Sequence, residues 1–163
     1  MSETKWLSDT ERATWIQLSA VLELLPGVLD SQLRRDAELT YYEYYVLAML
    51  SEVPNRTLRM TILAAQTNAT LSRLSHVVKR LVEKGYVDRY TCPEDGRANN
   101  VRLSDRGWAK VQGAAPAHVA TVREHVFDTL TPVQVADLAA ITTALLTRLD
   151  PDGKMRPTAY ASA

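Results

Sequence analysis

The order of apolar and polar residues predicts a long amphipathic helix near the middle of the chain, followed directly by a two-stranded hairpin. After Asn68 the apolar residues recur every three or four positions, which is the period of an α-helix: Leu71, Leu74, Val78, Leu81 and Val82. Gly85 is placed to end this helix in a left-handed conformation. Residues 86–90 then alternate as a strand does, residues 92–100 are rich in turn-forming residues, and residues 101–103 form the returning strand.

The residues before this helix predict that it is the second helix of a pair. Residues 57–59 fit a short strand, residues 61–66 fit a brief helix, and residues 67–69 fit a tight turn. Two short helices joined by a tight turn, the second with a cationic outer face, form the pattern of a helix-turn-helix motif. The hairpin that follows is then expected to be its wing.

Start signals predict where the other helices begin. Residues 8–11 and 40–43 each have the spacing of a capping box, and residues 131–134 combine a capping threonine with proline at the first helical position. A further helix begins at Ser104 and is expected to loosen near residues 113–116, which include Gly113 and Pro116.

A leucine-rich helical stripe runs from Trp15 to Leu33 and needs a broader apolar partner than the later helices of one copy are expected to supply. Pro26 with Gly27 predicts a kink in it, or two short helices end to end. Dimerisation is the natural way to cover its surface. A second stripe, which is expected to be buried, includes Leu138, Ile141, Leu145 and Leu149.

These elements predict a mainly α fold with a small β-hairpin wing, in the α+β class: a winged helix-turn-helix with dimerisation helices at both ends. We expect the chain to divide into a dimerisation frame (residues 1–38 and 116–150), a DNA-binding domain (residues 39–115) and a mobile tail (residues 151–163).

Composition limits the classes of function. A chain of 163 residues with 46% hydrophobic content is a normal globular protein. The polar, acidic N-terminus is unlike a secretory signal, the longest apolar run (residues 44–50) is too short for a membrane span, and there is a single cysteine. We therefore expect a cytoplasmic protein. No Gly-rich phosphate loop, His-Glu-x-x-His pattern or nucleophile elbow is present, so we expect neither an enzyme nor a cofactor.

The distribution of charge changes the picture given by a net charge of zero. Residues 56–110 contain 11 Lys or Arg against 5 Asp or Glu, a balance of +6, whereas the rest of the chain has a balance of −6. A basic module on an acidic frame is typical of a protein with a polyanionic partner.

Three short segments stand out in the second half of the predicted motif and after it: RLVEKGYVDRY at 80–90, PEDGR at 93–97 and VRLSDRG at 101–107. In sequence and spacing they resemble the MarR family of bacterial transcriptional regulators. The resemblance implies a homodimeric winged helix-turn-helix protein that binds double-stranded DNA at a near-palindromic operator. It also implies a repressor that a small aromatic or phenolic effector releases. Ser104 stands where the family usually has Thr, and Lys79 stands where many members have Asp.

The outer face of the predicted recognition helix supplies most candidate DNA contacts. Side chains in its first half are placed to meet base edges in the major groove: Ser72, Arg73, Ser75 and His76. Lys79 and Arg80 lie further along and are expected to meet phosphates. An ordinary solvated helix face is the alternative for an isolated basic helix, and the adjacent wing favours DNA.

The resemblance adds a wing contact and an effector pocket. Arg97 matches the wing arginine that enters a minor groove, and Asp95 is placed to brace it, although a turn salt bridge gives the same pattern. Four aromatic residues are candidates for the pocket, although aromatic residues at helical spacing are more often core: Trp15, Tyr41, Tyr42 and Tyr45.

Two weaker hypotheses come from single residues. Cys92 is a redox candidate because cationic neighbours activate thiolates, although a lone loop cysteine is usually incidental. His118 and His125, seven positions apart, are more often solvated or core histidines than metal ligands, so we expect no metal.

A competing hypothesis belongs to a different class of function. A winged-helix fold also serves as a protein-interaction module or a dimerising scaffold without sequence-specific DNA binding. Cationic residues on both the helix and the wing favour the DNA-binding hypothesis.

Overall fold

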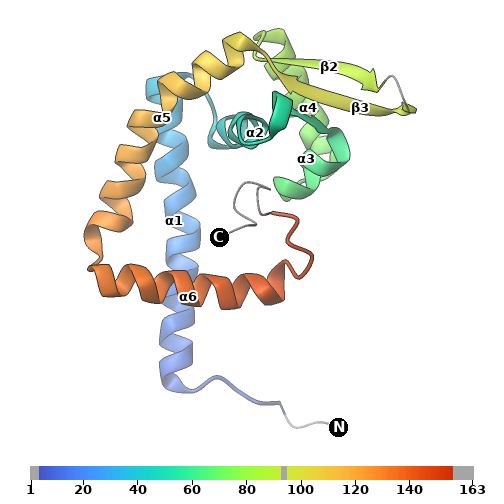
Figure 1. Ribbon diagram of the computed structural model, residues 1–163. Coiled ribbons are helices and arrows are strands. Elements are labelled where there is room, and N and C mark those ends of the chain that lie inside the picture. Colours follow the sequence, from blue (N-terminus) through green and yellow to red (C-terminus); the bar gives the residue numbers. More distant parts are fainter. Residues whose placement is uncertain (1–3, 93–94, 156–163) are drawn as a thin grey trace.

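The computed structural model describes residues 4–92 and 95–155, with no account of the side chains at 92 and 95–98 (Figure 1). These residues form, in order, α1 (Asp9–Ala37), α2 (Tyr41–Ser51), η1 (Pro54–Arg56), β1 (Thr57–Arg59), α3 (Met60–Gln66), α4 (Leu71–Glu83), β2 (Val87–Cys92), β3 (Asp95–Leu103), α5 (Asp105–His125), η2 (Phe127–Thr129) and α6 (Pro132–Leu149). The predicted fold class, mainly α with a β-hairpin wing, is confirmed.

All three capping boxes are formed. The side chains of Ser8, Thr40 and Thr131 accept hydrogen bonds from backbone amides three residues ahead, and the side chains at those later positions accept from the capping residues in return. These bonds satisfy amides that a helix leaves without partners at its start, so short polar sequences fix where α1, α2 and α6 begin.

A Schellman motif ends the recognition helix α4. Gly85 has a φ of +71°, the amide of Gly85 donates to the Val82 carbonyl at 2.9 Å, and that of Tyr86 donates to the Leu81 carbonyl at 2.9 Å. The predicted glycine stop is therefore confirmed, and the chain enters β2 directly.

The sheet has three antiparallel strands in the order β1-β3-β2. The predicted strand at residues 57–59 pairs with β3, with Leu58 opposite Val101, and β2 pairs with the other edge of β3, with Val87 opposite Leu103. Figure 1 shows the β2–β3 hairpin projecting from the helices as a wing.

The hydrophobic core lies inside the head formed by α2, α3, α4 and the sheet. Fully buried leucines and valines come from each of these elements, among them Leu47, Leu63, Leu74, Val87 and Val101. The C-terminal part of α1 joins the core through Leu33, and the first turns of α5 join it through Val111. The core therefore holds α4 against its neighbours and fixes which of its faces is exposed.

The alternative of two short helices at Pro26 was wrong, and so was the loosening expected near Gly113 and Pro116. α1 continues through Pro26, and α5 continues through Pro116 and Gly113. A proline removes one helical hydrogen bond and frees the carbonyl four residues earlier. For Pro26 that carbonyl belongs to Leu22, whose side chain is 60% exposed, so water can take the place of the missing donor.

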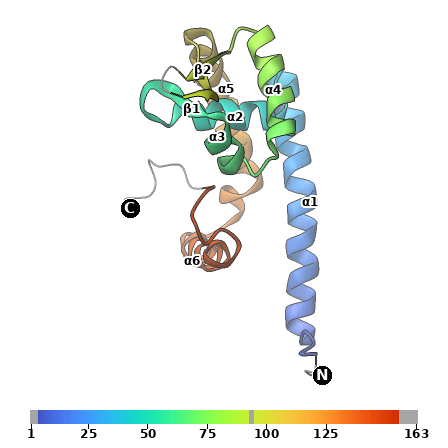
Figure 2. The same ribbon diagram turned by 90° about the vertical axis from the view of Figure 1, so that its right-hand side faces the viewer.

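The first half of α1 and all of α6 stand away from the head (Figures 1 and 2). No residue of α6 is buried, and large apolar side chains are exposed on both helices: Trp15, Ile16, Val21, Leu22 and Leu24 on α1, and Val133, Ile141, Leu145 and Leu149 on α6. The division into frame, DNA-binding domain and tail stays a prediction.

Within residues 4–92 and 95–155 no single helix is long and apolar enough to cross a membrane. The pair Asp105–Thr129 and Pro132–Leu149 meets such a length and composition only when taken together, and it is bent by 104°.

Candidate nucleic-acid interface

The helix α4 buries one face and exposes a polar face. Leu74, Val77, Val78 and Leu81 are buried, whereas the predicted contact residues Ser72, Arg73, His76, Lys79 and Arg80 are exposed, and Ser75 is half-buried. The apolar stripe differs from the prediction at its ends, because Leu71 and Val82 are 50% and 41% exposed and Val77 takes their place. The structure thus gathers these polar and cationic side chains on one accessible surface.

Arg73 lies in the first turn of α4 and stacks on a tyrosine of α2. Its guanidinium carbon is 4.4 Å from the centroid of the Tyr42 ring, within the range of a cation–π interaction. Its backbone amide donates to the hydroxyl of Thr70, which caps the helix, at 3.2 Å. The side chain of Arg73, which was predicted to contact a base, is therefore stacked on the ring of Tyr42.

Arg80 is bound to a buried carboxylate. Its Nε donates to Oε1 of Glu43 at 3.2 Å, and Nζ of Lys84 is 3.4 Å from Oε2 of the same carboxylate. The Glu43 side chain is 4% exposed, whereas that of Arg80 is 51% exposed. Arg80 consequently joins α4 to the start of α2, and only its outer nitrogens remain for a phosphate.

Opposing effects set the pKa of Glu43. Burial alone would raise this pKa. The hydrogen bond from the Thr40 amide and the cationic groups of Arg80 and Lys84 lower it by more than burial raises it, so the net shift is downward. Glu43 therefore stays ionised and pairs with Arg80 in the last turn of α4 and with Lys84, the residue that follows this helix.

A contact between β2 and α4 positions the wing. Nη1 of Arg89 donates to the hydroxyl of Ser75 at 3.0 Å, so the half-buried Ser75 faces the wing as well as the polar surface. The two remaining predicted contacts and the redox candidate fall at the adjoining ends of β2 and β3. The side chains of Asp95, Arg97 and the redox candidate Cys92 lie outside the described residues, so these predictions stay predictions.

The base of the wing is locked to the start of α5. Ser104 caps α5 by accepting from the Gly107 amide at 3.0 Å and donates to the Gly85 carbonyl at 2.7 Å. A Cβ added at Gly107 would lie 2.0 Å from the Tyr86 carbonyl oxygen, so only glycine fits there. Ser104, which stands where the family usually has threonine, keeps the hydroxyl that caps α5.

The candidate effector residues do not all come together within one chain. Tyr41 and Tyr45 stack with ring centroids 6.3 Å apart, and His118 of α5 lies 4.6 Å from the Tyr44 ring. Tyr42 faces Arg73 instead. Trp15 lies 15 residues before Asp30, whose carboxylate accepts from the Tyr41 amide. At a rise of about 1.5 Å per residue, roughly 22 Å of helix separates Trp15 from Asp30, and so from the tyrosines of α2.

The two histidines do not form a metal site with their neighbours. His118 packs among tyrosines, where burial lowers its pKa, and Nδ1 of His125 lies 3.0 Å from the Thr121 carbonyl oxygen. In the described part of the chain, no group of three or more His, Cys, Asp or Glu side chains lies close enough to hold a metal ion.

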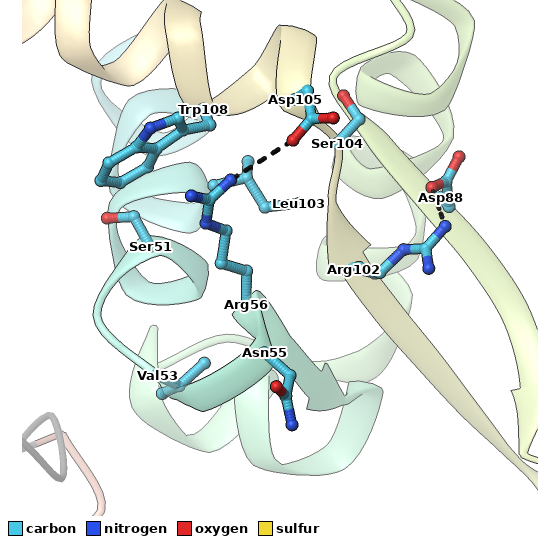
Figure 3. Close-up of a pocket in the computed structure, with 10 residues that line it drawn as sticks. All are labelled: Ser51, Val53, Asn55, Arg56, Asp88, Arg102, Leu103, Ser104, Asp105 and Trp108. Atoms are coloured by element: carbon cyan, nitrogen blue, oxygen red, sulfur yellow. Dashed lines mark hydrogen bonds and ion pairs between the residues drawn. The ribbon is translucent and has the colours of Figure 1, made fainter.

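A pocket at the base of the wing was not predicted from the sequence. It has a volume of about 750 Å³ and lies between η1, the end of β3 and the start of α5 (Figure 3). The Arg56 guanidinium lies 4.3 Å from the centroid of a Trp108 ring and 3.6 Å from the Asp105 carboxylate. Arg102 pairs with Asp88 at 2.9 Å. These partners are far apart in sequence and carry no motif, so only the fold reveals them.

A helix pair with a capped, cationic second helix, followed by a β-hairpin packed against that helix, defines the class of winged helix-turn-helix proteins. The family model of the MarR family matches residues 38–98. Sco3205, a MarR family transcriptional regulator from Streptomyces coelicolor solved in complex with DNA, is 40% identical, with a TM-score of 0.88 over 96% of this chain and 98% of that one. AbsC, a MarR family regulator from the same organism, is 34% identical, with a TM-score of 0.84 over 90% and 98%.

A mutant MarR from E. coli, complexed with operator DNA, shares the fold at 21% identity, with a TM-score of 0.74 over 87% of this chain and 99% of that one. No curated protein matches the sequence. With a structural relative 40% identical over nearly its whole length, the chain belongs to the MarR family of transcriptional regulators.

Proposed function

We propose that this protein is a homodimeric transcriptional regulator that binds double-stranded DNA with its α4 helix in the major groove. The observation that carries the proposal is the accessible face of α4, where Arg73, His76 and Lys79 lie together opposite the buried face. A helix of this kind fits the major groove, where bidentate arginine contacts read guanine and lysine contacts neutralise phosphates. The structures of Sco3205 and MarR with DNA support the same use of the fold.

The exposed apolar helices support a dimer. Among the described residues, most large apolar side chains of α6 and of the first half of α1 are exposed, and exposed apolar surface of this kind marks protein–protein contacts. A two-fold dimer presents two α4 helices to one side of the duplex. Their half-sites are then about 10 base pairs apart, and the operator is near-palindromic.

Repression released by a small effector completes the proposal. We expect aromatic or phenolic ligands to bind near the tyrosines of α2 beside His118, where burial raises the pKa of Tyr41 and Tyr45 and keeps both phenols neutral. The two heads of the dimer can lie at a separation that fits DNA or at one that does not. A ligand releases DNA only if it binds the second arrangement more tightly than the first. The protein acts in the cytoplasm, where it meets the chromosome.

Selection from a pool of random duplexes tests this function. The full-length protein should enrich a near-palindromic sequence whose half-site centres are about 10 base pairs apart. Sequences that remain random after several rounds would contradict sequence-specific binding. Adding phenols to the complex with the selected duplex then tests release, which should show as a loss of fluorescence anisotropy of labelled DNA.

A further inference from the structure

Tyr42 forms a rigid surface beneath the first turn of α4. Its ring is half-buried against the hydrophobic core, and its hydroxyl lies 3.0 Å from the hydroxyl of Thr67. Thr67 is buried and itself donates to the Leu63 carbonyl at 2.7 Å. Because a hydroxyl has one hydrogen, Tyr42 must be the donor to Thr67. One tyrosine thereby connects α2, the turn of the helix-turn-helix motif and α4.

Arg73 is held on this surface from both ends. The backbone of Arg73 is fixed by the Thr70 cap, and its guanidinium carbon lies 4.4 Å from the centroid of the Tyr42 ring. Arg80 of α4 donates to Glu43 and Arg89 of β2 donates to Ser75, whereas within the described residues the Arg73 guanidinium has no hydrogen-bond or ion-pair partner. Its donors remain available for a base.

We propose that Tyr42 is a specificity-determining residue, which positions the Arg73 guanidinium for a guanine in the major groove. The inference rests on the proposed function. An arginine side chain has many rotamers, and ordering it on binding costs free energy. A stacked guanidinium is already partly ordered in the free protein, so less free energy is lost when DNA binds. The edge of the stacked guanidinium still offers the paired donors that match O6 and N7 of guanine. The effect of Tyr42 should therefore appear in sequence preference rather than in general affinity for DNA.

A double-mutant cycle tests the proposal on the full-length protein and its selected duplex. Tyr42→Leu removes the aromatic face and keeps an apolar side chain against the core. We expect it to lower the ratio of specific to random-sequence affinity about fivefold, as expected for the loss of one cation–π contact, and to leave random-sequence affinity unchanged. In an Arg73→Ala background the same change should have no further effect, because the partner is gone. Tyr42→Phe should keep the wild-type ratio within about twofold, because the ring remains.

A second substitution keeps the test decisive if Tyr42→Leu does not fold. Pentafluorophenylalanine at position 42 preserves the shape of the Phe variant but reverses the charge distribution of the ring face, so it should reduce the specificity ratio relative to Tyr42→Phe. An equal loss on specific and random duplexes, or the same loss with and without Arg73, would overturn the role of Tyr42. A wild-type protein that enriches no sequence would instead refute the proposed function itself, which separates the two failures.

Discussion

The cationic residues of α4 differ in what they already contact. Arg73 stacks on Tyr42, Arg80 is paired with the buried Glu43, and Lys79 is exposed on the outer face. Donors already committed to a carboxylate contribute less to a new contact, because that ion pair has to be weakened first. Arg73 is consequently the strongest candidate for reading a base, and Arg80 acts mainly by holding α4 in place.

Replacing Arg73 tests this division of roles. Arg73→Ala should cost about 1–3 kcal/mol on the selected duplex and relax the preference at one base position, because a bidentate contact is lost. Lys79→Ala is the matched control, and it should weaken specific and random duplexes alike and reduce the salt slope by about 1. Competition binding against single-base variants measures both effects. A uniform loss with Arg73→Ala would contradict its assignment to a base.

Gly107 is predicted to be indispensable for the joint between the wing and α5. Gly107→Ala places a Cβ 2.0 Å from the Tyr86 carbonyl oxygen and 2.7 Å from Cδ1 of Leu103, so backbone must move. We expect a loss of at least about 2 kcal/mol in the free energy of unfolding. Gly113→Ala, in the same helix with nothing within 4 Å, should instead stabilise by roughly 0.5–1 kcal/mol. Urea unfolding compares them, and equal effects would refute the role of the close approach.

The sequence was sufficient to place side chains on faces but not to find their partners. The period of α4 predicted that Arg73, His76 and Lys79 lie outside, because that depends only on local geometry. The partner of Arg80 is Glu43, 37 positions earlier, and that of Arg73 is Tyr42 on a different helix. Such contacts depend on how α2 packs against α4, which no local pattern specifies.

At the scale of elements, helix ends were easier to predict than helix continuity. The capping boxes of α1, α2 and α6 are local hydrogen-bond patterns and were confirmed. The division of α1 into two helices at Pro26 was wrong because the cost of one lost hydrogen bond depends on solvent access to a carbonyl, which the sequence does not show. The pocket of Figure 3 escaped prediction for a similar reason, since it forms only where η1, β3 and α5 meet.

The ion pairs between α2 and α4 should make stability depend on pH. Because the pKa of Glu43 is lowered on folding, its contribution is present above its unfolded pKa and is lost as pH falls through the folded value. Glu43→Gln should therefore cost about 1–3 kcal/mol at neutral pH, less than a fully buried pair because Arg80 and Lys84 are partly exposed. The difference from wild type should shrink in acid.

Urea unfolding at a series of pH values measures this difference. Asp9→Asn is a suitable control, since Asp9 forms an ion pair with Arg12 on the exposed start of α1 and should change stability by less than about 1 kcal/mol. A Glu43→Gln penalty that stayed constant from neutral pH to acid would show that the carboxylate charge does not clamp α4.

At the scale of the whole molecule, the dimer is predicted to depend on the exposed apolar face of α6. Ile141 and Leu145 lie one turn apart and are 56% and 44% exposed. Light scattering should give twice the 18.2 kDa mass of one chain for the wild type. Replacing both residues with Asp should give a folded monomer that binds a single half-site weakly. Its affinity for a palindromic duplex should be no higher than for a single half-site. A wild-type monomer at micromolar concentration would refute the dimer.

The most direct test of sequence-specific DNA binding is the salt dependence of affinity for the selected duplex and for random DNA. Each phosphate that Lys or Arg neutralises contributes about −0.9 to the slope of log affinity against log salt concentration. We predict a steep negative slope for both duplexes, with the selected duplex bound about 10³-fold or more tightly at every salt concentration. A slope near zero, or equal affinity for the two duplexes, would contradict the account.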